Sequence, residues 1–437
     1  MKSFKRRFNI SGRLEDALNE CDAQRLGLTR ILVAGMLLVG LAFEDLQVLH
    51  HLPPTMARPN GIMTWVFHLG LGEALLSSPL ALAGLKLLAA TALICVLIGY
   101  KTRLALWLAT PSLLLIGGLV RCMSTFHHSD HVLLLMLPIL ALSNCDQAYS
   151  LSHWKNKCLD QPESHSKNDA WAMFCLWALV SLCYFSSGIS KLISGGGSWF
   201  DANSMRARML RGGLKTIEYG EGGIVGAYNL PDGFFLAAAC LVLSAELAAP
   251  MILVSRRLRK VLPCVYILFH GLVFWFQNIL FFEFILLQFI FLWNKPSPLK
   301  AANESRRPNK LVLGATLSTV LGTLALAGFQ RNYYPLTPYR MYVQAEAFPV
   351  RYERAFRRTN DGLIPLKAPP GPKGRKQIKK YLMRVANNCV LEPKASFCPG
   401  LIQVLSSQLG IQNPNSLVVR VSNFNRDGTT TLLGQHP

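Results

Sequence analysis

The sequence predicts an all-α polytopic membrane bundle of about eight or nine transmembrane helices, with a small α+β extracytoplasmic C-terminal domain. Three observations predict this fold. The 437 residues are 51% hydrophobic and their mean hydropathy is positive. The apolar residues gather into blocks of about 20, the length that crosses a hydrocarbon core roughly 30 Å thick. After residue 330, short polar and β-branched stretches such as 416–422 are typical of strands.

Three regions are expected along the chain. Residues 1–24 are polar and basic and form a predicted cytoplasmic segment. Residues 25–330 hold the apolar blocks and form the transmembrane domain. Residues 331–437 form a soluble extracytoplasmic C-terminal domain.

The first expected spans are apolar blocks separated by polar or basic residues. Residues 26–49 form the first block long enough to cross a membrane. Residues 50–79 mix aromatic and apolar stretches, and we expect a loop that lies on the membrane surface or re-enters it. Spans 80–99 and 104–120 are separated by the tight basic turn 100–103.

The middle spans follow the same pattern. A span over 131–143 is followed by residues 144–169, whose Asn, Asp, Pro and Ser favour turns. The next span, 170–192, is the most apolar in its centre, since eleven of the twelve residues 172–183 are apolar.

The last part of the bundle is less regular. Residues 193–232 are rich in glycine, and we expect a loop, which at this length is usually functional or disordered. A span over 233–254 ends at the basic turn 255–260. Residues 261–293 are too long for one span, and polar residues near 277–283 predict a break into two helices. A final span, 311–329, completes the bundle.

The charge pattern predicts the orientation. With the N-terminus in the cytoplasm, the basic stretches 100–103, 255–260 and 294–310 all lie inside, as the positive-inside rule expects. The net charge of +21 is therefore not a signal for nucleic acid. In this topology residues 331–437 lie outside the cytoplasm.

The C-terminal region is strongly basic, with 16 Lys and Arg against 5 Asp and Glu from Arg331 onward. A solvated surface, or one attracted to anionic lipid headgroups, is the first interpretation, and a dock for a specific acidic partner is the alternative. We expect no nucleic-acid partner on this side. Cys389 and Cys398 can form a disulfide if the region faces an oxidising compartment.

Lys191 is the leading candidate for chemistry, because it stands near the end of the apolar span 170–192. A lysine at the bilayer centre costs about 2.5–3.5 kcal/mol, and less where it can snorkel to the interface. Tyr184, Gly188 and Lys191 are spaced i, i+4, i+7 and share one helix face, and Ser187 lies one turn before Lys191. A lysine removed from water gives up its proton more readily and can act as a base. A snorkelling anchor is the alternative.

A histidine cluster supplies a second candidate. His127, His128 and His131 are spaced so that two of them could share a metal in a helix, with Asp130 as an oxygen ligand. One cluster provides too few ligands, so we assign no metal. The alternative is a helix start capped by Ser129 and Asp130. In the predicted topology, His131 opens one span and Lys191 closes the next at the same outer face.

Two further ionisable residues lie within predicted spans. Glu246 and His270 are functional candidates because charged or titratable side chains are rare inside membranes. Each could instead be a structural polar group with satisfied hydrogen bonds.

Several short pieces of the chain together resemble a known domain. They are 28–31, 100–103, 128–135, 146–151, 184–192 followed by Trp199, 244–246 and 269–270. In this order and spacing, residues 25–293 resemble the HTTM (horizontally transferred transmembrane) domain, which is shared with the membrane part of vitamin K-dependent gamma-carboxylase.

The resemblance implies roles for the candidate residues. Lys191 matches the lysine regarded as the base that deprotonates vitamin K hydroquinone, and His131 matches a histidine thought to assist it. A lipid quinol is the implied cofactor. The residues expected to bind substrate or cofactor are Tyr184, Ser187, Gly188, Trp199, Glu246 and His270.

The chain also departs from the carboxylases. Ser190 replaces the first of two adjacent lysines, and a glycine-rich stretch, 194–198, precedes Trp199. Only residues 331–437 follow the last span, in place of the large lumenal part that binds the carboxylase's protein substrate. Carboxylation of glutamate is therefore not the reaction we expect, even where a quinol-type site remains.

Two functions stay open. The first is modification or maturation of an exported peptide or protein at the outer face of a bacterial inner (plasma) membrane, through a quinol-linked lysine base of a carboxylase/epoxidase-like lyase. Bacterial HTTM proteins also include a membrane factor needed to mature a secreted sporulation-delaying peptide toxin. The alternative is therefore a non-enzymatic membrane partner or chaperone for such a peptide. Both place the protein among membrane lipid.

The orientation leads to a first test. After mild reduction, the thiols of Cys389 and Cys398 should react with a membrane-impermeant maleimide added to intact spheroplasts, because the topology places both outside the cytoplasm. Mass spectrometry of the labelled cysteines measures this. Labelling that appears only after the membrane is opened would overturn the orientation.

Overall fold

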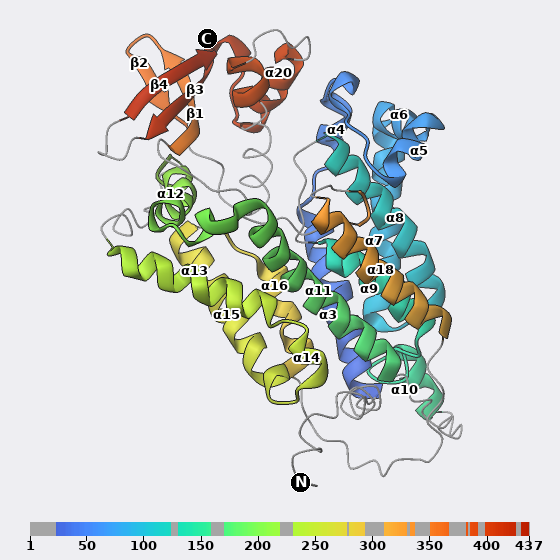
Figure 1. The fold of residues 1–437 in the computed structure, drawn as a ribbon. Helices are drawn as coiled ribbons and strands as arrows, with labels where there is room; N and C mark the ends of the chain where they lie inside the picture. The colour runs from blue at the N-terminus through green and yellow to red at the C-terminus, as the bar shows by residue number, and fades with distance from the viewer. Residues whose placement is uncertain are drawn as a thin grey trace.

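The computed structural model describes residues 23–123, 130–158, 170–218, 230–277, 279–292, 310–329, 333–336, 350–366, 382, 385–391, 398–424 and 430–436. Within these ranges the chain is mainly helical, with one antiparallel sheet near the C-terminus (Figure 1). The predicted N-terminal segment lies almost wholly outside the described residues, as do His127, His128 and Ser129.

Five helices of the described part are long and apolar enough to cross a membrane. They are α3 (Ala23–Phe43), α7 (Pro79–Ile98), α8 (Thr102–Met123), α11 (Ala170–Gly195) and α15 (Leu258–Gln277). The protein is therefore a helical membrane protein, as the apolar blocks predict.

Shorter helices occupy the other predicted spans. They are α9 (His131–Leu142), α13 (Asp232–Leu247) with α14 (Met251–Val254), α16 (Phe282–Leu287) with α17 (Phe289–Leu292), and α18 (Lys310–Gly328). The predicted break within 261–293 is present, since α15 ends at Gln277 and α16 begins at Phe282. The count of eight or nine crossings stays a prediction.

Two expectations near the N-terminus need correction. The first span was expected to run to residue 49, but α3 ends at Phe43, where the carboxylates of Glu44 and Asp45 interrupt the apolar run, and α4 (Gln47–His51) is separate. The expected loop 50–79 is largely helical, and contains η1, α5 and α6. Their bounds are Pro54–Met56, Ile62–His68 and Leu71–Ser77.

The prediction that residues 193–232 form a glycine-rich loop is wrong over its first half. Helix α11 continues to Gly195, and is followed by η2 (Gly196–Phe200) and α12 (Ala202–Glu218). The carboxylate of Asp201 accepts a hydrogen bond from the Ser204 amide at 2.7 Å, which satisfies a free amide in the first turn of α12. Helix α12 packs against α13 on one side and against the sheet on the other (Figure 1).

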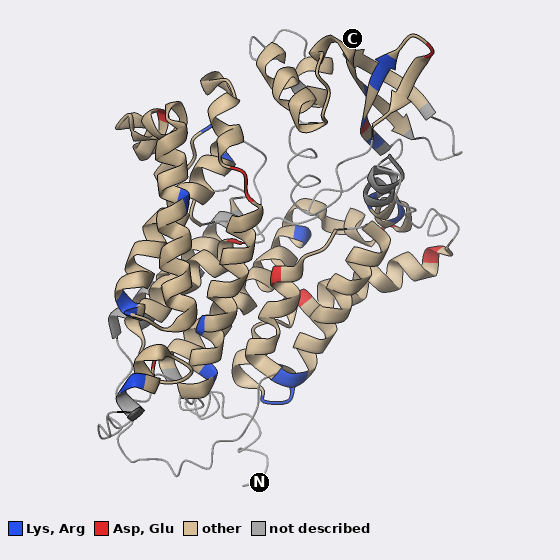
Figure 2. Ribbon diagram, turned by 180° about the vertical axis from the view of Figure 1, so that it is seen from behind, with Lys and Arg blue, Asp and Glu red and all other residues tan. Residues whose placement is uncertain are grey.

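Charges are sparse along the apolar helices and gather at their ends (Figure 2). The basic turns between α7 and α8 and between α14 and α15 lie at the end of the bundle opposite the sheet (Figures 1 and 2). Inside the bundle, the Arg30 guanidinium donates to the Tyr149 carbonyl at 2.5 Å, and the Lys86 ammonium donates to the Glu44 carbonyl at 2.6 Å. Each of these cations thus has a backbone acceptor.

The C-terminal region forms a sheet with strand order β2-β1-β3-β4 and antiparallel pairing throughout. The strands are β1 (Val350–Thr359), β2 (Gly362–Pro365), β3 (Leu417–Phe424) and β4 (Thr430–His436). Beside the sheet lie η4 (Ala386–Val390) and α20 (Cys398–Gln408), which a disulfide between Cys389 and Cys398 joins. This is the α+β region that the change of pattern after residue 330 predicts.

Tyr334 fastens the chain after α18 back onto the bundle. Its hydroxyl donates to the Leu114 carbonyl of α8 at 2.7 Å, and its carbonyl accepts from the Ile62 amide at 2.9 Å. Gly61 stands against this backbone with φ +62°, and a Cβ on Gly61 would lie 2.1 Å from the Tyr334 carbonyl oxygen. Only glycine fits both the backbone conformation and the space.

Gly61→Ala should therefore destabilise the protein more than Gly70→Ala. Gly70 is the control for a positive φ without a steric clash, since its φ is +73° and no atom lies within 4 Å of its added Cβ; the ψ of −132° at Gly61, against −5° at Gly70, adds backbone strain to the effect of the contact. The control should lose about 1–2 kcal/mol from backbone strain alone. Thermal unfolding in detergent measures both. Equal losses would show that the contact with Tyr334 is dispensable.

Candidate functional site

The last half of α11 carries a row of buried polar side chains on one face. Tyr184, Ser187 and Lys191 follow each other at the spacing of helix turns, and each is at most 3% exposed. Buried polar groups in an apolar helix need partners from neighbouring helices. The structure supplies them in two adjacent clusters.

The first cluster is centred on the ammonium group of Lys191. It donates to the Glu246 carboxylate of α13 at 2.5 Å and to the Ser187 hydroxyl at 2.8 Å. The Ser187 hydroxyl in turn donates to the same Glu246 oxygen at 3.2 Å. Both charged side chains are buried, at 2% and 4% exposure. Lys191 therefore forms a buried ion pair between α11 and α13.

Gly188 and Trp199 shape the space around this pair. A Cβ added to Gly188 would lie 3.1 Å from the Glu246 Cβ, so the glycine permits the close approach of α11 and α13. The Lys191 ammonium lies 5.2 Å from the ring centre of Trp199, and the Arg208 guanidinium of α12 lies 4.0 Å from it. The indole thus contacts two cations and closes the site on the side of α12.

The second cluster is a chain of hydrogen bonds around Tyr184, two turns before Lys191 on α11. The Gln288 amide nitrogen donates to the Phe284 carbonyl and to the Tyr184 hydroxyl, both at 2.9 Å. The Tyr184 hydroxyl is 2.9 Å from His270 Nε2. Because Tyr184 accepts from Gln288, its own proton goes to His270 Nε2, which leaves the ring proton of neutral His270 on Nδ1.

The two clusters act on each other electrostatically. The charge of Glu246 acts on the Tyr184 hydroxyl, and the charge of Lys191 acts on His270. Two buried atoms, Glu246 Oε2 and His270 Nδ1, have no hydrogen-bond partner within the described residues. Since most buried polar atoms are paired, these two are open to a ligand: Glu246 Oε2 can accept a hydrogen bond or a proton, and the His270 Nδ1–H can donate a hydrogen bond.

His131 lies in a different cluster. It is fully buried at the start of α9, where its ring contacts the Tyr334 ring edge-to-face at 5.3 Å. Beside it, Arg121 forms an ion pair with Asp130 and donates to the Gly117 carbonyl at 2.8 Å. Burial raises the pKa of the Tyr334 hydroxyl well above its usual range, so this group stays a donor.

The structure thus brings most predicted residues together but not all. Lys191, Ser187, Gly188, Glu246 and Trp199 form one cluster. Tyr184 and His270 join it from the adjacent one. Within the part of the chain that the structure describes, His131 is not among the hydrogen-bond or charge partners of Lys191.

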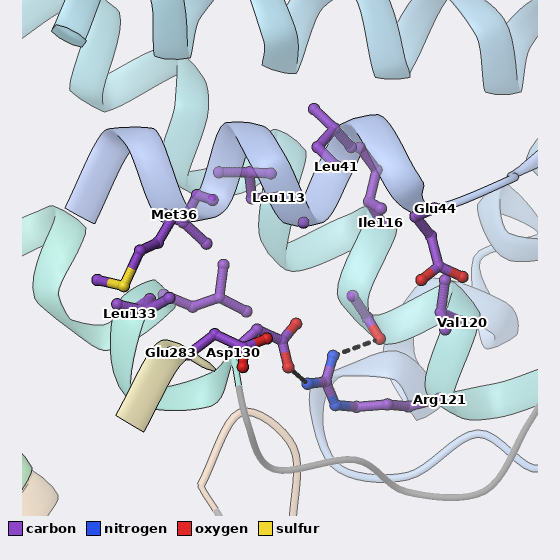
Figure 3. A pocket seen from close by; sticks show the side chains of 14 residues that line it. Met36, Leu41, Glu44, Leu113, Ile116, Val120, Arg121, Asp130, Leu133 and Glu283 are labelled. Atoms are coloured by element: carbon purple, nitrogen blue, oxygen red, sulfur yellow. Dashed lines mark hydrogen bonds and ion pairs between the residues drawn. The ribbon is translucent and has the colours of Figure 1, made fainter. Parts of the chain in front are cut away.

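A small cavity of about 90 Å³ lies beside the His131 cluster, between α3, α8, α9 and α16. Its walls are mostly aliphatic, and Figure 3 shows Glu44, Arg121, Asp130 and Glu283 around the same hollow. Lys191 does not line this cavity. Among the described residues, no group of three or more His, Cys, Asp or Glu is placed to hold a metal ion.

The sequence interpretation missed three residues of these clusters. Gln288 is a single amide in the apolar run 284–292, which is itself a signal of a buried polar contact. Arg208 was not recognised as a site residue because the segment that forms its helix was expected to be a loop. Arg121 gave no signal, since a basic residue at a helix end is ordinary.

Comparison of the chain with protein-family models, with curated proteins and with solved structures found no match.

Breaking the buried ion pair should destabilise the protein. Lys191→Met or Glu246→Gln alone leaves one buried partner behind and should cost about 3–5 kcal/mol, whereas the double variant removes both charges and should recover much of that loss. Thermal unfolding monitored by tryptophan fluorescence measures all three. A double variant as unstable as the sum of the single variants would contradict a direct pairing.

Proposed function

We propose that this membrane protein moves protons at the Lys191–Glu246 pair while it modifies or matures an exported peptide or protein. One observation carries the proposal: a lysine and a carboxylate share a 2.5 Å hydrogen bond in a site closed to water between α11 and α13. Perturbed ionisable groups in such settings are typical of functional sites.

The geometry supports a specific division of roles. As long as Lys191 is protonated, it cannot act as a base. Glu246 is placed to accept its proton through their direct hydrogen bond, which would leave a neutral amine beside a neutral carboxylic acid. In a low-dielectric site the neutral pair competes with the ion pair, because burial disfavours both charges. The neutral Lys191 amine is then the base, and Ser187 holds it in place.

A lipid quinol remains the proposed cofactor, in line with the resemblance to the HTTM domain. The donor set fits its chemistry, since the buried Glu246 Oε2 has no hydrogen-bond partner in the described part and can receive a hydroxyl. When bound, a quinol would supply a weakly acidic hydroxyl group. Lys191 is only 2% exposed, so access requires Trp199 or α12 to move away from it.

Two features support an outer-face site in a bacterial inner membrane. The basic turns lie at the end of the bundle opposite the sheet, which favours a cytoplasmic position for that end (Figure 2). The disulfide between Cys389 and Cys398 favours an oxidising compartment for the sheet end. Helix α11 runs toward the sheet, so Lys191 lies nearer to that end (Figure 1).

A second candidate function has its own supporting observation. The enclosure of Lys191 by Glu246, Ser187 and Trp199 is also what a purely structural ion pair would show. In that case the protein is a non-enzymatic membrane partner or chaperone for an exported peptide, such as a sporulation-delaying toxin.

Lys191→Arg separates the two functions. A guanidinium keeps the ion pair with Glu246 but stays protonated, so it cannot serve as a base. We expect the variant protein to be present at normal abundance. Maturation of the exported peptide or protein encoded by the neighbouring gene should fall at least a hundredfold, on the order of what a general base contributes. Lys191→Ala and His131→Ala are measured in parallel. Full maturation by Lys191→Arg would leave the structural role standing.

A further inference from the structure

The outer strand of the sheet, β4, has one free edge. It pairs with β3 alone, and within the described residues its other edge has no backbone hydrogen bond. Its central side chains are exposed, with Leu432 at 54% and Leu433 at 47%. Leu433 has no partner on β3, because the register shifts between Val421 and Ser422.

This edge lacks the usual protection against pairing. The strand Thr430–His436 contains no Lys, Arg, Asp, Glu or Pro. Natural sheets protect their edges with charges, with proline or by covering them, since an exposed apolar edge recruits another strand. Apart from the register shift, β4 has none of these devices in the described part of the chain. Its edge is therefore suited to strand addition.

The charges near β4 indicate what kind of strand it takes. Arg354 of β1 and Arg420 of β3 are cross-strand partners, and both guanidinium groups lie near the Phe356 ring, at 5.8 and 5.3 Å. Arg420 Nε also donates to the Gln435 side chain of β4 at 3.1 Å. Arg420 therefore places a positive charge directly beside the open strand, and Arg354 adds a second one strand behind it.

A second copy of the chain is a poor occupant of this edge. Residues 331–437 hold 16 Lys and Arg against 5 Asp and Glu, so two copies joined through β4 would bring two strongly positive regions together. An acidic segment gains from the same charge.

We infer that β4 binds an extended acidic segment of a peptide or protein, which adds to the sheet as a fifth strand. The backbone edge supplies hydrogen bonds, and Arg420, with the charge of Arg354 behind it, favours carboxylates. The acidic segment is the class of partner on which the proposed function would act. The inference rests on that function only where it identifies the bound segment with the exported substrate.

The position of the sheet suits this role. Strand β1 packs against α12, α12 carries Arg208 onto Trp199, and Trp199 covers Lys191. A segment bound to β4 is thus connected to the buried pair through β3, β1, α12 and Trp199.

Peptide binding to the full-length protein in nanodiscs tests the inference. The probe is a fluorescein-labelled heptapeptide of alternating Glu and Val, and the control has Lys in place of Glu. We expect saturable binding of the acidic peptide alone, weakened by salt, and about tenfold weaker binding by Arg354→Gln/Arg420→Gln. Equal binding of both peptides, or no effect of the double variant, would overturn the charge selection.

Cross-linking tests the strand addition itself. Acidic peptides with one Cys at successive positions are incubated with Gln435→Cys, and with Ile364→Cys on the opposite edge as the matched control. Side chains alternate along a strand, so disulfides to position 435 should form at every second peptide position, and few should form to position 364. Cross-links without this period, or dimers of Gln435→Cys in place of peptide adducts, would overturn the inference.

One variant keeps this result separate from the proposed function. Lys191→Arg should bind the acidic peptide as the unmodified protein does, because its substitution lies outside the sheet. Binding that persists while Lys191→Arg matures its product fully would refute the proton-transfer function and retain the peptide site. Loss of binding in Lys191→Arg would contradict a site confined to β4.

Discussion

The ion pair between Lys191 and Glu246 is the contact on which the arrangement of this end of the bundle depends. Each charge, taken from water alone, would cost several kcal/mol, so both must stay paired and hydrogen-bonded. Helices α11 and α13 are thereby held together, with Gly188 at their closest approach. Helix α13 supports α12, and α12 supports β1. The buried pair thus contributes to the placement of the sheet through α13, together with the packing of α12 against α15.

The need of both charges for hydrogen-bond partners also explains why polar side chains surround the pair. Ser187 completes the coordination of the ammonium, and the Gln288–Tyr184–His270 chain places oriented dipoles two turns from Lys191. Buried networks of this kind are rigid when every member is satisfied. Here Glu246 Oε2, His270 Nδ1 and Gln288 Oε1 are left without a hydrogen-bond partner within the described residues, so neither network is complete. Of these atoms, Glu246 Oε2 is the one that can take up a proton.

Much of the fold could be read from the sequence, because apolar blocks and basic turns reflect the membrane directly. The spacing of Ser187 and Lys191 predicted one shared helix face. The choice of Glu246 as the partner of Lys191, in contrast, is set by which helices are neighbours, and sequence periodicity carries no such information. His131 was grouped with Lys191 by its depth and by the resemblance, and neither fixes a contact. Helix α12 was not predicted because the nearby glycines indicated a loop, although Asp201 is a residue type that caps a helix start.

Two contacts limit how the sheet can move. Strand β1 packs against α12, and α20, which the disulfide joins to η4 beside the sheet, packs against α4. A body held at two separate points cannot swing about either of them. The C-terminal sheet is therefore a fixed platform, and anything seated on it is presented to the bundle at a constant height and angle.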